Sequence, residues 1–230
     1  MHVVSRIVDR QFLLGDVERE TFIAMMRQYE EFCGMRVLSY CVMSNHFHIL
    51  LEIPPKMDVV DLSDEDFLAK LGTIYSDVYV KEVKKLMQKL NKNQAPKAMR
   101  ELKAKYTYRM GDMSQFMKSL KQRFTQWYNK KHGRRGTLWE ERYSATAVSA
   151  GDGARMVAAY IDLNPLRAGM VADPKDYRWC SYGEAVAGNG KESQKARSAY
   201  TYLFQMAAMP GAVVAELTED EAMREYRMLM

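Results

Sequence analysis

Residues 45–52 constrain the fold more than any other segment, because polar and apolar side chains alternate along the first part of them. Such alternation predicts a β-strand, and side chains two positions apart then lie on one face, roughly 6 to 7 Å apart. His46 and His48 therefore share a face and can hold a divalent metal ion. The alternative is a polar strand face on which both histidines are satisfied by hydrogen bonds. The opposite face carries Phe47, Ile49 and Leu51.

The segments around this strand predict the fold class. Residues 1–8 have the pattern of a strand, residues 17–32 that of an amphipathic helix ended by Gly34, and residues 36–43 that of a second strand. The order strand, helix, strand, strand favours an α+β fold. We expect a ferredoxin-like antiparallel sheet of about four or five strands with helices on one face.

The remaining chain divides into helical and irregular segments. Expected are a helical insertion at 57–111 with a break at 91–96, helices at 112–132, 150–163 and 218–230, a strand or hairpin at 137–148, and a linker at 186–195. Proline at position 165 should end the helix that precedes it. These segments suggest one domain over 1–183, including the insertion, and a C-terminal extension over 184–230.

Composition excludes several classes of protein. The 230 residues, 47% of them hydrophobic, suffice for one large globular domain. The three cysteines lack the spacing of a disulfide framework or of a four-thiolate zinc site. Apolar runs stay well below the ~20 residues of a membrane span, and the first residues resemble a strand instead of a signal peptide. We therefore expect a cytoplasmic protein without a membrane partner.

Positive charge is concentrated in two blocks, although the net charge is only +5. Residues 81–109 carry ten Lys or Arg, and a second basic block runs over 118–142 with aromatic residues interspersed. Basic side chains beside aromatic rings suit a polyanion with stackable bases, that is, a nucleic acid. The alternative is that these blocks are ordinary solvated helix faces.

The helix expected at 112–132 offers a nucleophile. Its apolar residues recur at helical spacing and predict a buried stripe. Tyr128 borders this stripe, with His132 one turn further along and Lys121 on the same flank. A tyrosine at this border is partly packed and partly exposed, which suits a nucleophile. The alternative is amphipathic packing, which is the more common reason for a tyrosine at such a place.

Five segments together resemble a known family: VMSNHFHILL (42–51), RFTQWYN (123–129), GRRGTLW (133–139), NPLRAGMV (164–171) and YRWCSY (177–182). They resemble the REP-associated branch of the single-tyrosine, His-hydrophobic-His transposases, over about 1–56 and 112–183. Ser44 stands where proline is common in that family. The insertion is longer than the resemblance leads us to expect, and the chain after 184 is unmatched.

The resemblance implies a metal site and a covalent intermediate. His46 and His48 would hold Mg²⁺ or Mn²⁺, with a third ligand one turn after the nucleophile. For Tyr128 as nucleophile that ligand is His132, at a place where related enzymes often have Gln or Asn. Three imidazoles would suit Mn²⁺, Co²⁺, Ni²⁺ or Zn²⁺ better than Mg²⁺. Tyr128 would attack the scissile phosphate and form a 5′-phosphotyrosine intermediate.

The expected substrate is single-stranded DNA near a hairpin, acted on by a monomer or a homodimer. Candidate DNA-binding residues are Lys121, Arg123, Lys130, Lys131, Arg134, Arg135, Trp139 and Arg142. Trp139 is alternatively a core residue, and the arginines alternatively solvate a turn. Two other functions stay open: a DNA- or RNA-hairpin-binding protein without turnover, and a metal-dependent phosphoesterase that uses water as nucleophile.

Overall fold

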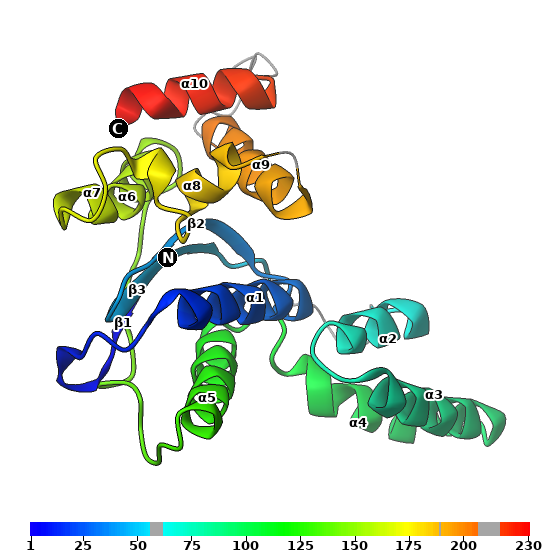
Figure 1. Ribbon diagram of the computed structural model, residues 1–230. Helices are drawn as coiled ribbons and strands as arrows, with labels where there is room; N and C mark the ends of the chain where they lie inside the picture. The colour runs from blue at the N-terminus through cyan, green and yellow to red at the C-terminus, as the bar shows by residue number, and fades with distance from the viewer. Residues whose placement is uncertain (56–61, 189, 207–216) are drawn as a thin grey trace. The chain divides into compact units, whose positions relative to one another are not determined.

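A computed structural model describes residues 1–55, 62–188, 190–206 and 217–230. The chain forms two compact units. Figure 1 labels helices and strands that they contain. The first unit comprises residues 1–23, 37–52 and 128–230, and the second comprises residues 24–36 and 53–127. In the part of the chain described, none of the helices is both long and apolar enough to traverse a bilayer.

The first unit is built on a four-stranded sheet in the order β2-β3-β1-β4. Its strands are β1 (His2–Arg6), β2 (Arg36–Val42), β3 (His46–Glu52) and β4 (Ser144–Thr146). β1 pairs antiparallel with β3, so that Val4 lies opposite His48 and Arg6 opposite His46. This arrangement confirms the α+β fold class and the strand, helix, strand, strand order that begins the chain. Of the strand or hairpin expected at 137–148, β4 and an isolated bridge between Ile7 and Trp139 are present.

One face of the sheet is apolar and packs against the first part of α1 (Asp16–Cys33), which belongs to the same unit. Phe47 is fully buried there, with its ring 4.6 Å from that of Phe22 on α1 and 5.4 Å from that of Trp139. Because side chains alternate along β3, His46 and His48 point to the opposite face. The alternation in residues 45–52 therefore separates an aromatic core from an imidazole-bearing face.

Helices also cover the imidazole-bearing face, which goes beyond the expectation of helices on one face. α6 (Asp152–Asp162) packs on β3, and the buried cluster there joins Leu50 of β3 to Ala158 of α6. α7 (Asn164–Arg167) begins directly after α6, with Pro165 in its first turn, where the missing N–H is tolerated. The same cluster includes residues of α8 (Ser181–Val186), α9 (Lys191–Gln205) and α10 (Glu219–Leu229).

A buried carboxylate on α6 connects these helices. Asp162 is fully buried and accepts hydrogen bonds from the hydroxyls of Tyr200 on α9 (2.8 Å) and Tyr226 on α10 (2.5 Å). The backbone N–H of Tyr182 (3.2 Å) and the hydroxyl of Ser39 (3.4 Å) also donate to it. Burial raises the pKa of Asp162 to about 6, despite these four donors. This one side chain therefore links α6 to β2, α8, α9 and α10.

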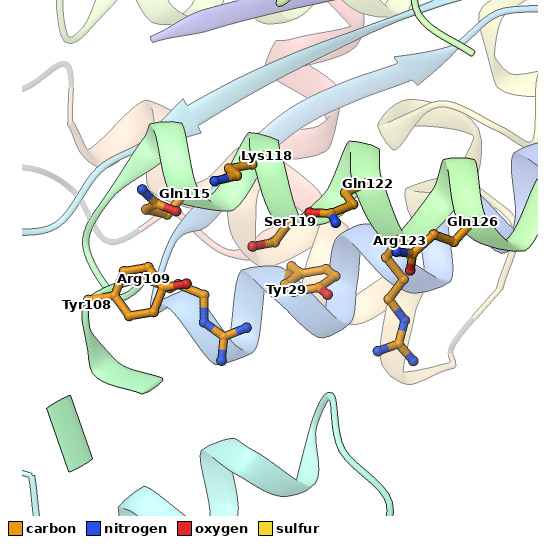
Figure 2. Close-up of a pocket in the computed structure, with 9 residues that line it drawn as sticks. All are labelled: Tyr29, Tyr108, Arg109, Gln115, Lys118, Ser119, Gln122, Arg123 and Gln126. Carbon is orange, nitrogen blue, oxygen red and sulfur yellow. The ribbon is translucent and has the colours of Figure 1, made fainter. Parts of the chain in front are cut away.

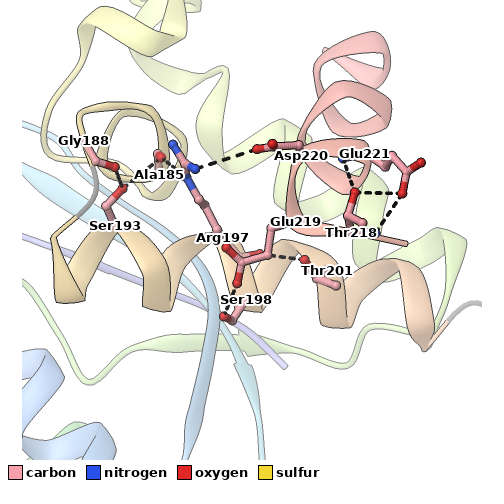
Figure 3. A network of polar contacts seen from close by, with 10 residues as sticks. All are labelled: Ala185, Gly188, Ser193, Arg197, Ser198, Thr201, Thr218, Glu219, Asp220 and Glu221. Carbon is pink, nitrogen blue, oxygen red and sulfur yellow. Dashed lines mark hydrogen bonds and ion pairs between the residues drawn. The ribbon is translucent and has the colours of Figure 1, made fainter. Parts of the chain in front are cut away.

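The described residues after 184 belong to the first unit. Figure 3 shows polar contacts that connect α8, α9 and α10. The expected linker over 186–195 is wrong from Lys191 onward, because α9 starts there. Arg197 of α9 donates to the carbonyl of Ala185 at 2.8 Å, which holds α9 against the end of α8. The expected terminal helix is confirmed as α10, whose first turn is closed by a capping box between Thr218 and Glu221.

The second unit is helical, as expected for the insertion. It contains α2 (Asp64–Gly72), α3 (Asp77–Lys92), α4 (Pro96–Thr107) and α5 (Met113–Lys131) up to Trp127. The expected break at 91–96 separates α3 from α4. Lys103 of α4 donates to the carbonyl of Leu62 and pairs with Asp64 at 2.7 Å, which ties α4 to the start of α2. Residues 56–61, which include the start of the expected insertion, lie outside the described residues.

Candidate functional site

Three of the four histidines in the sequence gather on the imidazole-bearing face of the sheet. The rings of His46 and His48 lie 5.1 Å apart in a T-shaped arrangement. His2, on the neighbouring strand β1, stacks on His48 with ring centroids 5.2 Å apart, and its Nε2 lies 3.0 Å from Nδ1 of His48. The residues predicted as a ligand pair thus lie together, and His2 is an additional member that the sequence analysis did not single out.

The environment keeps these imidazoles neutral. Burial, followed by the neighbouring His46, lowers the pKa of His48 to about 3. Burial and then Arg6, which lies opposite His46 in the sheet, lower the pKa of His46, and burial likewise lowers the pKa of His2. A neutral imidazole presents a nitrogen lone pair, which is the form that binds metal ions.

Tyr160 of α6 lies against this histidine cluster. The edge of its ring packs on His48 at 5.9 Å and on His2 at 6.2 Å between centroids. Its side chain is 41% exposed, and the guanidinium of Arg167 on α7 lies 5.1 Å from the ring. Tyr160 therefore combines access to solvent with proximity to the imidazoles and to a cation.

The sequence contained a signal for Tyr160 that was missed. Asn164 of the NPLRAGMV segment stands four residues after Tyr160. This is the spacing at which the resemblance leads us to expect Gln or Asn after the tyrosine. In the structure Asn164 donates to the carbonyl of Tyr160 at 3.0 Å, so the two residues lie one helical turn apart. Tyr160 and Asn164 thus have the four-residue spacing and the amide side chain that the resemblance implies. The pair Tyr128 and His132 has the spacing but a histidine in place of the amide.

Tyr128 and His132 lie with α1, away from this arrangement. Their rings stack at 4.3 Å, and His132 Nε2 lies 3.1 Å from the carboxylate of Glu18 on α1. Phe22, one turn after Glu18, packs on Phe47 and so on the opposite face of the sheet from the imidazoles. Among the described residues, no three His, Cys, Asp or Glu side chains are arranged to hold a metal ion. The expected set of His46, His48 and His132 is therefore not assembled.

Electrostatics around Tyr128 favour the phenol over the phenolate. Tyr128 is 5% exposed, and burial followed by the charge of Glu18 raises its pKa. Burial opposes ionisation of Glu18 itself, but hydrogen bonds from Lys131 and His132 outweigh it and hold the pKa of Glu18 below its usual value. The Glu18 cluster thus has the features of a structural ion-pair network.

The predicted DNA-binding residues fall into two groups. Trp139 is 6% exposed in the aromatic core with Phe22 and Phe47, and Lys121 is 8% exposed, so both side chains present little surface to a ligand. Lys131 is exposed but pairs with Glu18 at 2.7 Å. The second group lies at the surface. Lys130, Arg135 and Arg142 are exposed, and Arg123 and Arg134 are partly exposed.

The second unit has a polar groove of about 380 Å³ (Figure 2). Positive charge in its lining comes from Arg109, Lys118 and Arg123. Arg123 also donates to the carbonyl of Ile74 at 3.0 Å, which fixes its side chain. The remaining lining residues are Tyr29, Tyr108, Gln115, Ser119, Gln122 and Gln126. Cations beside amide and hydroxyl groups give this groove the chemistry of a surface that binds phosphates.

The donor atoms around His46 and His48 fit a divalent metal ion. Asn45 Oδ1, an acceptor, lies 2.7 Å from Nδ1 of His46, so this nitrogen carries the proton and the lone pair is on Nε2. The imidazole pair supplies two nitrogen ligands, and water or a side-chain oxygen would supply the others. Two nitrogen ligands with oxygen ligands suit Mn²⁺ and also allow Mg²⁺.

Comparisons with known proteins concern the family of the first 98 residues and the fold of the chain. Residues 1–98 match the family described as IS200-like transposases. The fold is similar to that of a REP-associated tyrosine transposase solved bound to a REP hairpin, with a TM-score of 0.50 and 13% sequence identity. That match covers 81% of this chain and 78% of the other. The sequence has no significant match among functionally curated proteins. The expected resemblance to IS200-like transposases is therefore confirmed over residues 1–98, and the likeness to the REP-associated tyrosine transposase is confirmed as a likeness of fold.

Proposed function

We propose that this protein nicks and rejoins single-stranded DNA near hairpins, with Tyr160 as the nucleophile. The observation that carries the proposal is the position of an exposed tyrosine against the ring of buried His48, which itself lies beside His46. Tyr160 Oη attacks the scissile phosphorus, a bond from that oxygen to phosphorus forms, and the bond to the 3′ oxygen breaks. The phenol loses its proton to solvent as it attacks, and the leaving oxygen takes up a proton from solvent and becomes a 3′-OH, so no net proton is gained or lost. The DNA downstream keeps its 5′ phosphate on the tyrosine.

The proposal assigns the metal site to Nε2 of His46 and Nε2 of His48, with the amide oxygen of Asn164 as the third ligand. A divalent ion bound there would polarise the phosphate and offset its developing charge. Because one phosphodiester is exchanged for another, the reverse attack by a 3′-OH restores DNA without an external energy source. The identity of the ion follows from the donor set, which favours Mn²⁺ and permits Mg²⁺.

Cations around the site would hold the phosphate backbone. Arg167 lies over the ring of Tyr160, and Arg6 stands opposite His46 on the same face of the sheet. We assign the scissile phosphate to these two guanidinium groups, which bind phosphates through paired N–H donors. We assign the flanking DNA to exposed Lys130, Arg135 and Arg142. Hairpin DNA as the partner is supported by the ligand of the structural neighbour.

The function is tested with a labelled single-stranded hairpin DNA and Mn²⁺. We expect a protein–DNA adduct that survives boiling in detergent, because a phosphotyrosine bond is covalent. A label on the 3′ side of the nick should stay on the protein, and a label on the 5′ side should be released. A chelator should prevent the adduct, and fully duplex DNA of the same sequence serves as a control.

The same assay separates the two other functions. Metal-dependent cleavage that leaves every DNA end free of protein would identify a phosphoesterase that uses water. Tight binding of the hairpin without any cleavage would identify a non-catalytic binding protein. Either result would contradict the proposed tyrosine chemistry.

The metal ligands are tested by calorimetric titration of Mn²⁺. Replacing His46 with Ala removes one of two nitrogen ligands, and we expect affinity to fall by about a hundredfold or more. His132→Ala is the matched control: we expect it to leave the affinity unchanged, because His132 lies with Glu18. A large loss of affinity in His132→Ala would restore this histidine to the ligand set, as the sequence originally suggested.

A further inference from the structure

The hydrogen-bond partners of the two ligand histidines differ in kind. His46 Nδ1 faces the amide oxygen of Asn45, whose own nitrogen donates to the carbonyl of Arg10 at 3.0 Å. This bond fixes the orientation of the Asn45 amide, so that its oxygen accepts a hydrogen bond from the N–H at Nδ1 of His46. The corresponding nitrogen of His48 faces another imidazole, Nε2 of His2, at 3.0 Å.

The position of His2 is fixed by the sheet and by α6. Val4 lies opposite His48 in the pairing of β1 with β3, and His2 is two residues from Val4 on the same face. The rings of His2 and His48 are stacked with an interplanar angle of 18°, and Tyr160 packs edge-on against both. His2 is therefore a held member of the site and not a mobile surface side chain.

Taking the proposed metal site as given, we propose that His2 is a positioning residue for the ligand His48. Nε2 of His2 accepts a hydrogen bond from the N–H at Nδ1 of His48, so that the lone pair of His48 lies on Nε2, the atom that binds the metal. Ligand histidines usually donate their second N–H to such a partner, which sets both the tautomer and the orientation of the ring. Here a neutral imidazole takes the role that a carboxylate or carbonyl usually fills.

This role is distinct from that of a third imidazole ligand. Nε2 of His2 has one lone pair, so it cannot both accept a hydrogen bond from His48 and bind a metal ion. The positioning role therefore predicts that two imidazoles contact the metal, whereas a ligand role predicts three. The two possibilities differ in a quantity that can be measured.

Titration of the full chain with Co²⁺, together with X-ray absorption of the bound ion, tests the inference. We expect His2→Ala to weaken metal binding by about 10- to 100-fold while the number of imidazoles around the metal stays at two. His2→Gln should recover much of the affinity, because its amide oxygen reaches the place of Nε2 and can accept the same proton. Thermal melting of each metal-free variant establishes that the fold is retained.

Three results would overturn the inference. Unchanged affinity in His2→Ala would mean that His48 needs no such partner. Loss of one imidazole from the metal would make His2 a ligand, and failure of His2→Gln to bind better than His2→Ala would contradict the role of the accepted proton. The adduct assay remains separate: affinity that depends on His2 in a chain that forms no adduct would support the positioning role and contradict the proposed function.

Discussion

Replacing Tyr160 with Phe is expected to abolish the covalent adduct with hairpin DNA and to lower strand cleavage by about a thousandfold or more, because the attacking oxygen is lost. The ring and its edge contact with His48 remain, so Mn²⁺ binding and DNA binding should be retained. The measurement is the yield of detergent-resistant adduct, alongside hairpin affinity at one fixed salt concentration.

Tyr128→Phe is the matched control for this experiment. Tyr128 is buried beside His132 and Glu18, and we expect its variant to form the adduct at nearly the rate of the unmodified protein. The opposite pattern, with adduct formed by Tyr160→Phe and lost in Tyr128→Phe, would return the nucleophile to the position first predicted from the sequence. If both variants fold but neither forms the adduct, the assay does not distinguish the two tyrosines. The tryptic peptide that carries the labelled DNA in the unmodified protein would then identify the nucleophile.

Replacing Asp162 with Ala is expected to cause the largest loss of stability. Removing the carboxylate leaves the buried hydroxyls of Tyr200 and Tyr226 without their acceptor, together with the N–H of Tyr182. We expect the free energy of unfolding to fall by about 3 to 5 kcal/mol, as for other broken buried polar networks. Urea denaturation monitored by circular dichroism measures this change.

Asp173→Ala provides a control for Asp162→Ala. Asp173 also accepts hydrogen bonds, from Arg227 at 2.6 and 2.9 Å, but its partner is exposed and solvent replaces the lost contacts. We expect a much smaller change in stability. Equal effects in the two variants would contradict the special role of the buried carboxylate.

The stability should also depend on pH through Asp162. Its pKa in the folded state, about 6, is above that of an unfolded chain, so the folded state binds the proton more tightly. The contribution of this group is therefore complete below about pH 4 and is lost as the pH rises through about 6. Relative to Asp162→Asn, which does not titrate, the unmodified protein should gain on the order of 1 kcal/mol between pH 7 and pH 5. A pH-independent difference would refute the raised pKa.

Local patterns in the sequence predicted most of the first unit. Alternation identified β1 and β3, and glycine at position 34, with a φ of 68°, marks the end of α1 as expected. The helical insertion and its break at Pro96 also follow from local periodicity and turn residues. The linker expected at 186–195 was wrong because glycine and serine also begin helices: Gly190 precedes α9, and Ser193 binds the carbonyls of Ala185 and Gly188 from within it.

The candidate site was harder to predict because it depends on contacts between distant segments. The pair His46 and His48 follows from strand geometry alone, whereas His2 reaches His48 across 46 residues of sequence. Two tyrosine-bearing helices fitted the proposed chemistry, and helical periodicity cannot say which face of a sheet a helix covers. The contact between Phe22 and Phe47 places the start of α1 on the face opposite the imidazoles, and that fact requires a structure.

Helix α6 has different partners on its two sides. Contacts made by the C-terminal helices therefore help to position Tyr160 beside the histidines of β1 and β3. Tyr160 meets the histidines contributed by the first 48 residues, while Asp162, two positions later, is held by tyrosines of α9 and α10. Shortening the protein before α9 would remove both of those hydroxyl donors from the buried carboxylate. Such a truncated chain would retain every residue that we propose for catalysis. The helix α6, which carries the proposed nucleophile, would however lose the hydrogen bonds that Tyr200 and Tyr226 donate to Asp162. An active fragment should therefore include α9 and α10, which carry Tyr200 and Tyr226.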